Sequence, residues 1–124
     1  IALEAGDLEY VGYAAYHLCF NSYLIGYELT ALDQMMLGYV QVLDELKQVT
    51  TLNYCHICRQ VVLNLATSES QPFLLIGEAF NEETGIPQLL AANAATGLFT
   101  QYTHKLYLRY LFEAITEAKS NAMN

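Results

Sequence analysis

The chain has 124 residues, of which 54% are hydrophobic, and thirteen acidic against five basic side chains give it a net charge of −8. This length and apolar content predict one folded domain over residues 1–124 and exclude a disordered segment. The negative charge, and the lack of any apolar run near the roughly 20 residues that span a bilayer, exclude nucleic acid and membranes as expected partners.

Aromatic side chains at helical spacing mark the first predicted element. They fall three or four residues apart, on one side of a helix, and are Tyr13, Tyr16, Phe20, Tyr23 and Tyr27. We expect this helix to begin after Asp7, a suitable N-cap, and to end near Gly26. Two-residue alternation is not sustained and Asn-Gly or Asp-Gly turns are lacking, so helices are predicted rather than strands.

Apolar faces of helical period define the next two elements. A second helix is expected from Thr30 as N-cap, with Asp33 at the capping-box position. Its inward face comprises Leu32, Met35, Met36, Tyr39, Val42, Leu43 and Leu46, with Met36 and Val40 toward its flank. A third helix is expected from residues 50–51 to Leu65, with an inward face of Leu52, Cys55, Cys58, Val62 and Leu65.

Turn-forming residues divide the second half of the chain. Residues 67–72 are predicted as a loop, because Ser, Thr and Pro are frequent there. Segment 73–80 is apolar enough to be buried; we expect a helix that begins near Pro72, with a short strand as the alternative. Pro87 is expected in the first turn of a helix that continues to Ala92. A helix over 96–112 and a short one over 114–121 complete the prediction.

Similar helix ends suggest an internal repeat. Tyr23, Asn64 and Tyr110 each lie near a predicted helix end, 41 and then 46 residues apart. This exceeds the ~34 residues of a tetratricopeptide unit but lies within the range of helix-pair repeats with longer loops. We therefore predict an all-α fold of stacked antiparallel helix hairpins, a tetratricopeptide-like right-handed array. An irregular helical bundle is the alternative.

Four sequence blocks, in order, resemble one known family. They are GDLEYVGYAAYH (6–17), LKQVTTLNY (46–54), QVVLNL (60–65) and IGEAFNEE (76–83). Together they resemble the helical segment that follows the AAA-type ATPase module in large bacterial, notably cyanobacterial-type, multi-sensor signalling kinases. In that family a serine/threonine kinase domain lies upstream, and GAF and histidine-kinase domains lie downstream. The resemblance covers nearly the whole chain and implies a spacer or interaction module.

The chain departs from the family pattern at two places. Cys58-Arg59-Gln60 stands where the family has Tyr-Trp-Gln, and Glu113 follows Phe112 directly where the family tends to have a glycine-containing turn. The chain also lacks a Gly-Lys-Ser/Thr phosphate loop and the His-Arg-Asp and Asp-Phe-Gly motifs of kinases. We therefore expect no catalytic residue and no cofactor in this segment, which is not an enzyme by itself.

The cysteines bear on metal binding and on the cellular compartment. An odd number, Cys19, Cys55 and Cys58, is typical of buried free thiols in a reducing compartment, so we expect a cytoplasmic protein. Residues 1–7 resemble no secretion signal and suggest a segment of a longer polypeptide. Zinc would need His17 or His56 beside these thiols, but the spacing is only half right, and no metal is expected. A cysteine nucleophile would also need a positioned His and an oxyanion donor.

Three polar stripes are the candidate partner-binding residues. They are His17 and Asn21 on the first helix, Asn53, His56, Gln60 and Asn64 on the third, and Gln101, Lys105 and Arg109 on the penultimate helix. The uncharged stripe is suited to bind backbone groups, and the two cations to bind an acidic peptide or a flanking domain. The alternative is that these are ordinary solvated faces, or that the cations pair with Glu113 or another helix.

Two further hypotheses concern partners and ligands. A fragment of a helical array exposes apolar faces, so self-association of this chain is expected as an additional partner interaction. Ten tyrosines also fit a different function, a small-molecule-sensing helical domain with a ligand pocket between helices. The sequence shows no convergent polar cluster that would place such a pocket.

Overall fold

A computed structural model describes residues 7–67 and 71–123 and contains five α-helices within them. They are α1 (Leu8–Leu24), α2 (Leu29–Glu45), α3 (Val49–Ala66), α4 (Glu82–Ala91) and α5 (Ala95–Met123). Over these residues the structure has no strand, and one isolated antiparallel bridge joins Ile76 and Asn81. The prediction of an all-α protein is confirmed.

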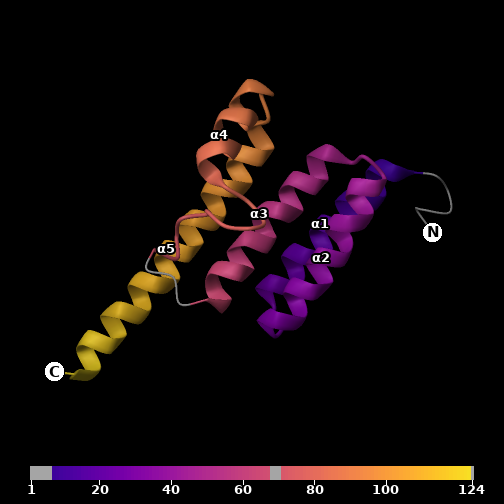
Figure 1. Cartoon of the computed structure of the whole chain (residues 1–124). Helices are drawn as coiled ribbons and strands as arrows, with labels where there is room; N and C mark the ends of the chain where they lie inside the picture. Colours follow the sequence, from indigo (N-terminus) through magenta and orange to yellow (C-terminus); the bar gives the residue numbers. More distant parts are fainter. Residues whose placement is uncertain (1–6, 68–70, 124) are drawn as a thin grey trace.

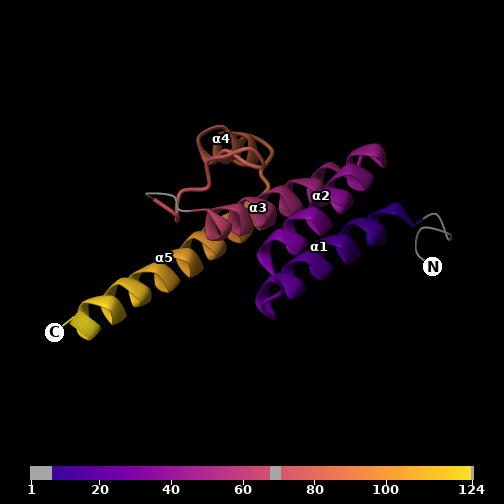
Figure 2. The ribbon, with the colours of Figure 1, turned by 60° about the horizontal axis from the view of Figure 1, so that its bottom comes forward.

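The third helix is the centre of the molecule. α3 packs against α1 and α2 on one side and against α5 on the other, and α4 packs against the first part of α5 (Figure 1). The second view shows α1, α2 and α3 side by side, with the C-terminal half of α5 extending past them (Figure 2). In the described chain, no helix has both the length and the apolar composition needed to cross a bilayer.

Local signals set the ends of the first two helices. Asp7 caps α1 as predicted, since its carboxylate accepts a hydrogen bond from the Tyr10 amide at 3.4 Å. Gly26 follows α1 with a φ of 81°, a conformation that glycine adopts without strain. The predicted N-cap at Thr30 is wrong. Glu28 is the N-cap, because its carboxylate accepts hydrogen bonds from the amides of Thr30 and Ala31 at 2.8 Å each.

The main core lies between α1, α2 and α3. Its buried members are Ala15, Cys19, Leu32, Met36, Val40, Leu43, Cys55, Cys58 and Val62. Met36 and Val40 are central rather than flanking, and Val42 is 41% exposed, so the inward face of α2 is rotated from the predicted one. The aromatic seam of α1 packs only in its middle, because Tyr13 and Tyr27 at its ends are exposed.

A second core forms on the other side of α3. Ile57 and Val61 of α3 meet Leu75 of the segment before α4 and Leu108 of α5, and all four are fully buried. The single inward face predicted for α3 is therefore too narrow, since a central helix must bury two faces.

The second half of the chain differs most from the prediction. Segment 73–80 is neither helix nor strand, and α4 begins at Glu82 with Asn81 as its N-cap, so that Pro87 lies inside α4 rather than in its first turn. The predicted break after residue 112 is also wrong, because α5 is one helix, with no Gly or Pro beyond Gly97 to interrupt it. Tyr110 is therefore not a helix end. Thr67, Gln71 and Pro72 lie outside the helices as predicted, and residues 68–70 lie outside the described residues.

Two glycines give a matched test of the close packing between α1 and α3. A Cβ atom at Gly12 would clash with the Thr51 hydroxyl of α3, whereas one at Gly38 of α2 meets open space. Both glycines lie inside helices, so the higher helix propensity of Ala adds about 0.5–1 kcal/mol to the free energy of unfolding at each position. We expect Gly38→Ala to stabilise the protein and Gly12→Ala to be about 1–3 kcal/mol less stable than Gly38→Ala in urea unfolding. Equal stabilities would contradict this contact.

Candidate functional site

The predicted partner-binding residues lie on three helices that pack in succession, α1, α3 and α5. His17 and Asn21 of α1 are exposed, and Asn53 and His56 of α3 are half-buried. Most of the other predicted residues on α3 and α5 are buried by other parts of the chain. The structure therefore does not assemble the nine residues into one open groove.

Gln60 and Asn64 hold the segment that precedes α4. The Asn64 amide donates to the carbonyl oxygens of Pro72 and Leu74 at 2.8 and 2.6 Å, and it accepts from Gln60 at 2.9 Å. The Gln60 carbonyl in turn accepts from the amides of Ala79 and Phe80 at 3.0 and 3.1 Å. Two residues of the predicted stripe thus bind backbone groups of the same chain, and these bonds are not partner contacts.

This arrangement brings the segment very close to α3. A Cβ atom at Gly77 would clash with the Gln60 amide, so a residue without a side chain is needed where the segment crosses. The segment runs back along α3, from Asn64 toward Gln60, before α4 begins (Figure 1). Gln60 and Asn64 are accordingly covered and are not a free surface.

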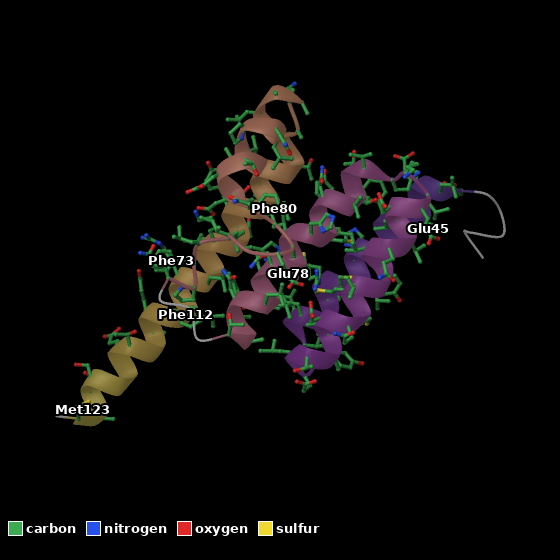
Figure 3. All side chains as sticks on the ribbon, in the orientation of Figure 1. Glu45, Phe73, Glu78, Phe80, Phe112 and Met123 are labelled. Atoms are coloured by element: carbon green, nitrogen blue, oxygen red, sulfur yellow. The ribbon has the colours of Figure 1, made fainter. Side chains whose placement is uncertain are left out.

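Arg59 joins the segment to the first helical hairpin. Its Nε donates to Asp33 of α2 at 2.7 Å and its Nη2 donates to Glu78 at 2.6 Å. Burial by itself would lower the pKa of the Arg59 guanidinium, but the hydrogen bonds and charges of Asp33 and Glu78 raise it. Figure 3 labels Glu78 on the segment where it passes over α3. In the sequence, Arg59 differs from its neighbours only as a departure from the family pattern.

Two of the three predicted polar residues on α5 have their side chains engaged within the protein: Gln101 is buried and Lys105 is paired. Lys105 pairs with Glu82 of α4 at 2.8 Å, so the alternative of pairing with another helix holds for this cation, and Glu113 is not its partner. Gln101 is fully buried, and neither atom of its amide has a hydrogen-bond partner among the described residues. Arg109 is exposed, and its guanidinium lies 4.6 Å from the ring centroid of Phe73, which lies beside α5 (Figure 3).

A buried cluster of thiols meets a histidine that sequence reasoning missed. Cys58 Sγ lies 3.4 Å from His104 Nε2, and the His104 ring packs edge-on against Phe20 and Tyr23. Burial lowers the pKa of His104 to about 4 and raises the pKa of the Cys58 thiol. His104 shares a helix face with Leu108, four residues on, and that spacing was the available signal for its burial.

Most other titratable groups of this region have pKa values shifted toward their neutral form, whereas a hydrogen bond with Cys55 lowers the pKa of Cys19. A hydrogen bond with Cys19, together with burial, raises the pKa of Cys55, and burial raises the pKa of Tyr23 to about 12. Burial and the charge of Arg59 lower the pKa of His56, whose Nδ1 has no partner among the described residues. Protonated thiols are weak nucleophiles and poor metal ligands.

Within residues 7–67 and 71–123, no three His, Cys, Asp or Glu side chains are placed to share a metal ion. Comparison with protein-family models, with curated proteins and with solved structures found no match to this chain.

The hydrogen bonds of Gln60 lead to a direct test. In Gln60→Ala, the amides of Ala79 and Phe80 lose their acceptor, which costs about 1–3 kcal/mol of local stability. We expect these amides to exchange with solvent about 10- to 100-fold faster by hydrogen-exchange NMR. Gln41→Ala, at an exposed position of α2, is the matched control. Unchanged exchange at residues 79 and 80 would show that Gln60 does not hold the segment.

The pKa of His104 predicts a pH-dependent stability. The folded chain keeps His104 neutral down to pH about 4, whereas the unfolded chain binds a proton below its ordinary pKa of 6.5. Its contribution is therefore complete above pH 6.5 and is lost as the pH falls toward 4, by about 3 kcal/mol in total. We expect His104→Gln to show a correspondingly smaller fall in unfolding free energy over this window. His17→Gln, at an exposed position of α1, is the control, and equal slopes for both variants would contradict the assignment.

Proposed function

We propose that this chain is a non-catalytic helical interaction module, and that the outer face of α5 binds a helix of a partner protein. The observation that carries the proposal is a row of large exposed side chains, Phe99 (71% exposed), Tyr102 (55%), Leu106 (71%) and Tyr110 (69%), which we call the α5 row. Contiguous exposed apolar side chains of this size mark interaction surfaces.

The α5 row has the geometry of a helix-recognition face. Its members are spaced three, four and four residues apart, so they follow one side of the helix. Gln101, His104 and Leu108 occupy the opposite side and are buried. Helices that bind in apolar grooves or pair with other helices present anchors at this spacing.

Charge indicates the chemistry of the partner. Arg109 flanks the α5 row, and among the described residues no carboxylate lies within salt-bridge distance of its guanidinium. A partner helix with an apolar face and an acidic side chain beside it satisfies both features. Pairing of two copies along α5 is less favoured, because each carries a net charge of −8.

The order of helix contacts supports a tetratricopeptide-like arrangement. Stacked helix hairpins require the first helices of successive hairpins to pack together, and α1 packs on α3 and α3 on α5. The pairs α1–α2 and α4–α5 are also in contact, as is α2–α3. Because the segment before α4 lies along α3, α4 packs on α5 alone. We regard the chain as such an array with its second hairpin opened.

The four sequence blocks support a parent protein for this module. They resemble the segment after the AAA-type ATPase module of multi-sensor kinases, so the module would link ATPase-like and sensor domains in a cytoplasmic signalling protein. Phosphoryl transfer would belong to the other domains, because the kinase and phosphate-loop motifs are absent from this chain. The partner helix would then come from a flanking domain or from a peptide segment that the module recruits.

Site-specific crosslinking tests the proposed surface. We would replace Leu106 with the photo-crosslinking amino acid p-benzoylphenylalanine in the producing cells, with the same residue at exposed Gln41 of α2 as control. The expected result is an adduct specific to position 106, mapped by mass spectrometry to an amphipathic helix that carries an acidic residue. The affinity of this partner helix for the purified module should be at least tenfold lower in the Leu106→Glu and Arg109→Glu variants than in the unchanged protein.

The other outcomes are equally informative. Identical adducts at both positions, or an unchanged affinity in both variants, would overturn the proposal. Adducts between two copies of this chain would replace it by self-association along α5.

A further inference from the structure

A cavity of about 260 Å³ lies between the N-terminal half of α3 and α4. The α3 side is lined by Val49, Thr50, Asn53 and Tyr54, and the other side by Phe80, Gly85, Gln88, Leu89, Ala92 and Ala94. None of the residues that form the α5 row lines it. The cavity is thus separate from the surface proposed to bind a partner helix, and a ligand could occupy it whether or not that helix binds.

The cavity exists because α4 packs against α5 and not against α3. Lys105 of α5 holds Glu82 at the start of α4, which fixes that end of the helix. Phe80 comes just before α4 and lies toward α3, where Gln60 binds its backbone (Figure 3). The space between α3 and α4 stays open beside Val49 and Ala92.

Two close approaches make the floor of the cavity tight. A Cβ atom at Gly85 would clash with the Phe80 ring, and one at Gly97 would press against Leu89 and approach Tyr54. Tyr54 is 5% exposed and Leu89 is 6% exposed, so both present fixed apolar surface from beneath. A floor built this closely cannot collapse to fill the space above it.

The lining selects a chemical class of ligand. None of the ten lining residues is charged, and the floor is aromatic and aliphatic. The amides of half-buried Asn53 and exposed Gln88 also line the cavity, and each can donate and accept hydrogen bonds to a ligand. An ionised molecule would lose hydration here without meeting an opposite charge, which costs several kcal/mol.

We infer that this cavity is a binding site for a small uncharged molecule with one ring-sized apolar part and a hydrogen-bonding group. The ring rests on Tyr54, Phe80 and Leu89, and the polar group meets Asn53 or Gln88. A cavity of roughly 150 Å³ already takes a benzene molecule, and drug-sized ligands occupy roughly 300–1,000 Å³. A volume of about 260 Å³ suits a single ring with a short substituent.

A pair of probes that differ in charge tests the inference. The ¹⁵N-labelled whole chain is titrated with benzyl alcohol and, separately, with benzoate at pH 7, and the amide resonances are followed by NMR. The expected result is a saturable shift centred on Asn53, Tyr54 and Leu89 with benzyl alcohol, and at least tenfold weaker binding of benzoate. Absence of saturable binding by benzyl alcohol, or equal binding of both probes, overturns the inference.

Matched substitutions locate the binding. Ala92→Phe enlarges a lining residue at the C-cap of α4, whereas Ala91→Phe enlarges the exposed last residue of α4, which is outside the lining. Benzyl alcohol binding should weaken at least tenfold in the first variant and remain in the second. Loss in both, or in neither, places the probe elsewhere and contradicts the site. Gln88→Phe, at an exposed lining position, replaces Ala92→Phe if that variant does not fold.

Discussion

Burial of α3 on two sides is the constraint on which the rest of the structure depends. One side carries the core shared with α1 and α2, and the other meets Leu75 and Leu108. A helix covered this way has few solvated positions, so leaving a buried polar side chain of α3 without a partner inside the protein is costly. Gln60 and Asn64 find theirs in the backbone of residues 72–80, and Arg59 finds two carboxylates. Polar residues of α3 therefore determine the path of the chain toward α4.

What the sequence predicted well was local. The helical content, the Asp7 cap and the reversal at Gly26 follow from neighbouring residues, and the structure has them. The features that the sequence could not predict depend on contacts between residues far apart in the chain. The path of residues 73–80 depends on bonds from Gln60 and Asn64, and the inward face of α2 depends on where α3 lies. The break expected near Phe112 has no turn-forming residue behind it, because Glu113 and Ala114, which are good helix formers, follow directly.

The candidate site shows the same division. The spacing of Asn53, His56, Gln60 and Asn64 correctly indicated one side of a helix, but spacing cannot say whether solvent, a partner or the chain itself covers that side. Gln60 and Asn64 bind the backbone of the same chain, and Asn53 lines a cavity. The sequence does not reveal the α5 row, because exposed aromatic residues on a helix have the same spacing as buried ones. The burial of Gln101, His104 and Leu108 on the opposite side tells the two faces of α5 apart.

The guanidinium of Arg59 touches residues 33 and 78, which lie on either side of it in the chain by 26 and 19 positions. In a simple stack of repeats, each unit feels only its neighbour, and the ends fray independently. Here one side chain binds α2, α3 and the approach to α4 into a single cooperative unit. Detaching the segment before α4 from α3 would take the Glu78 partner away from a guanidinium that is largely buried, and the molecule should therefore melt in one transition rather than unfold first at its end.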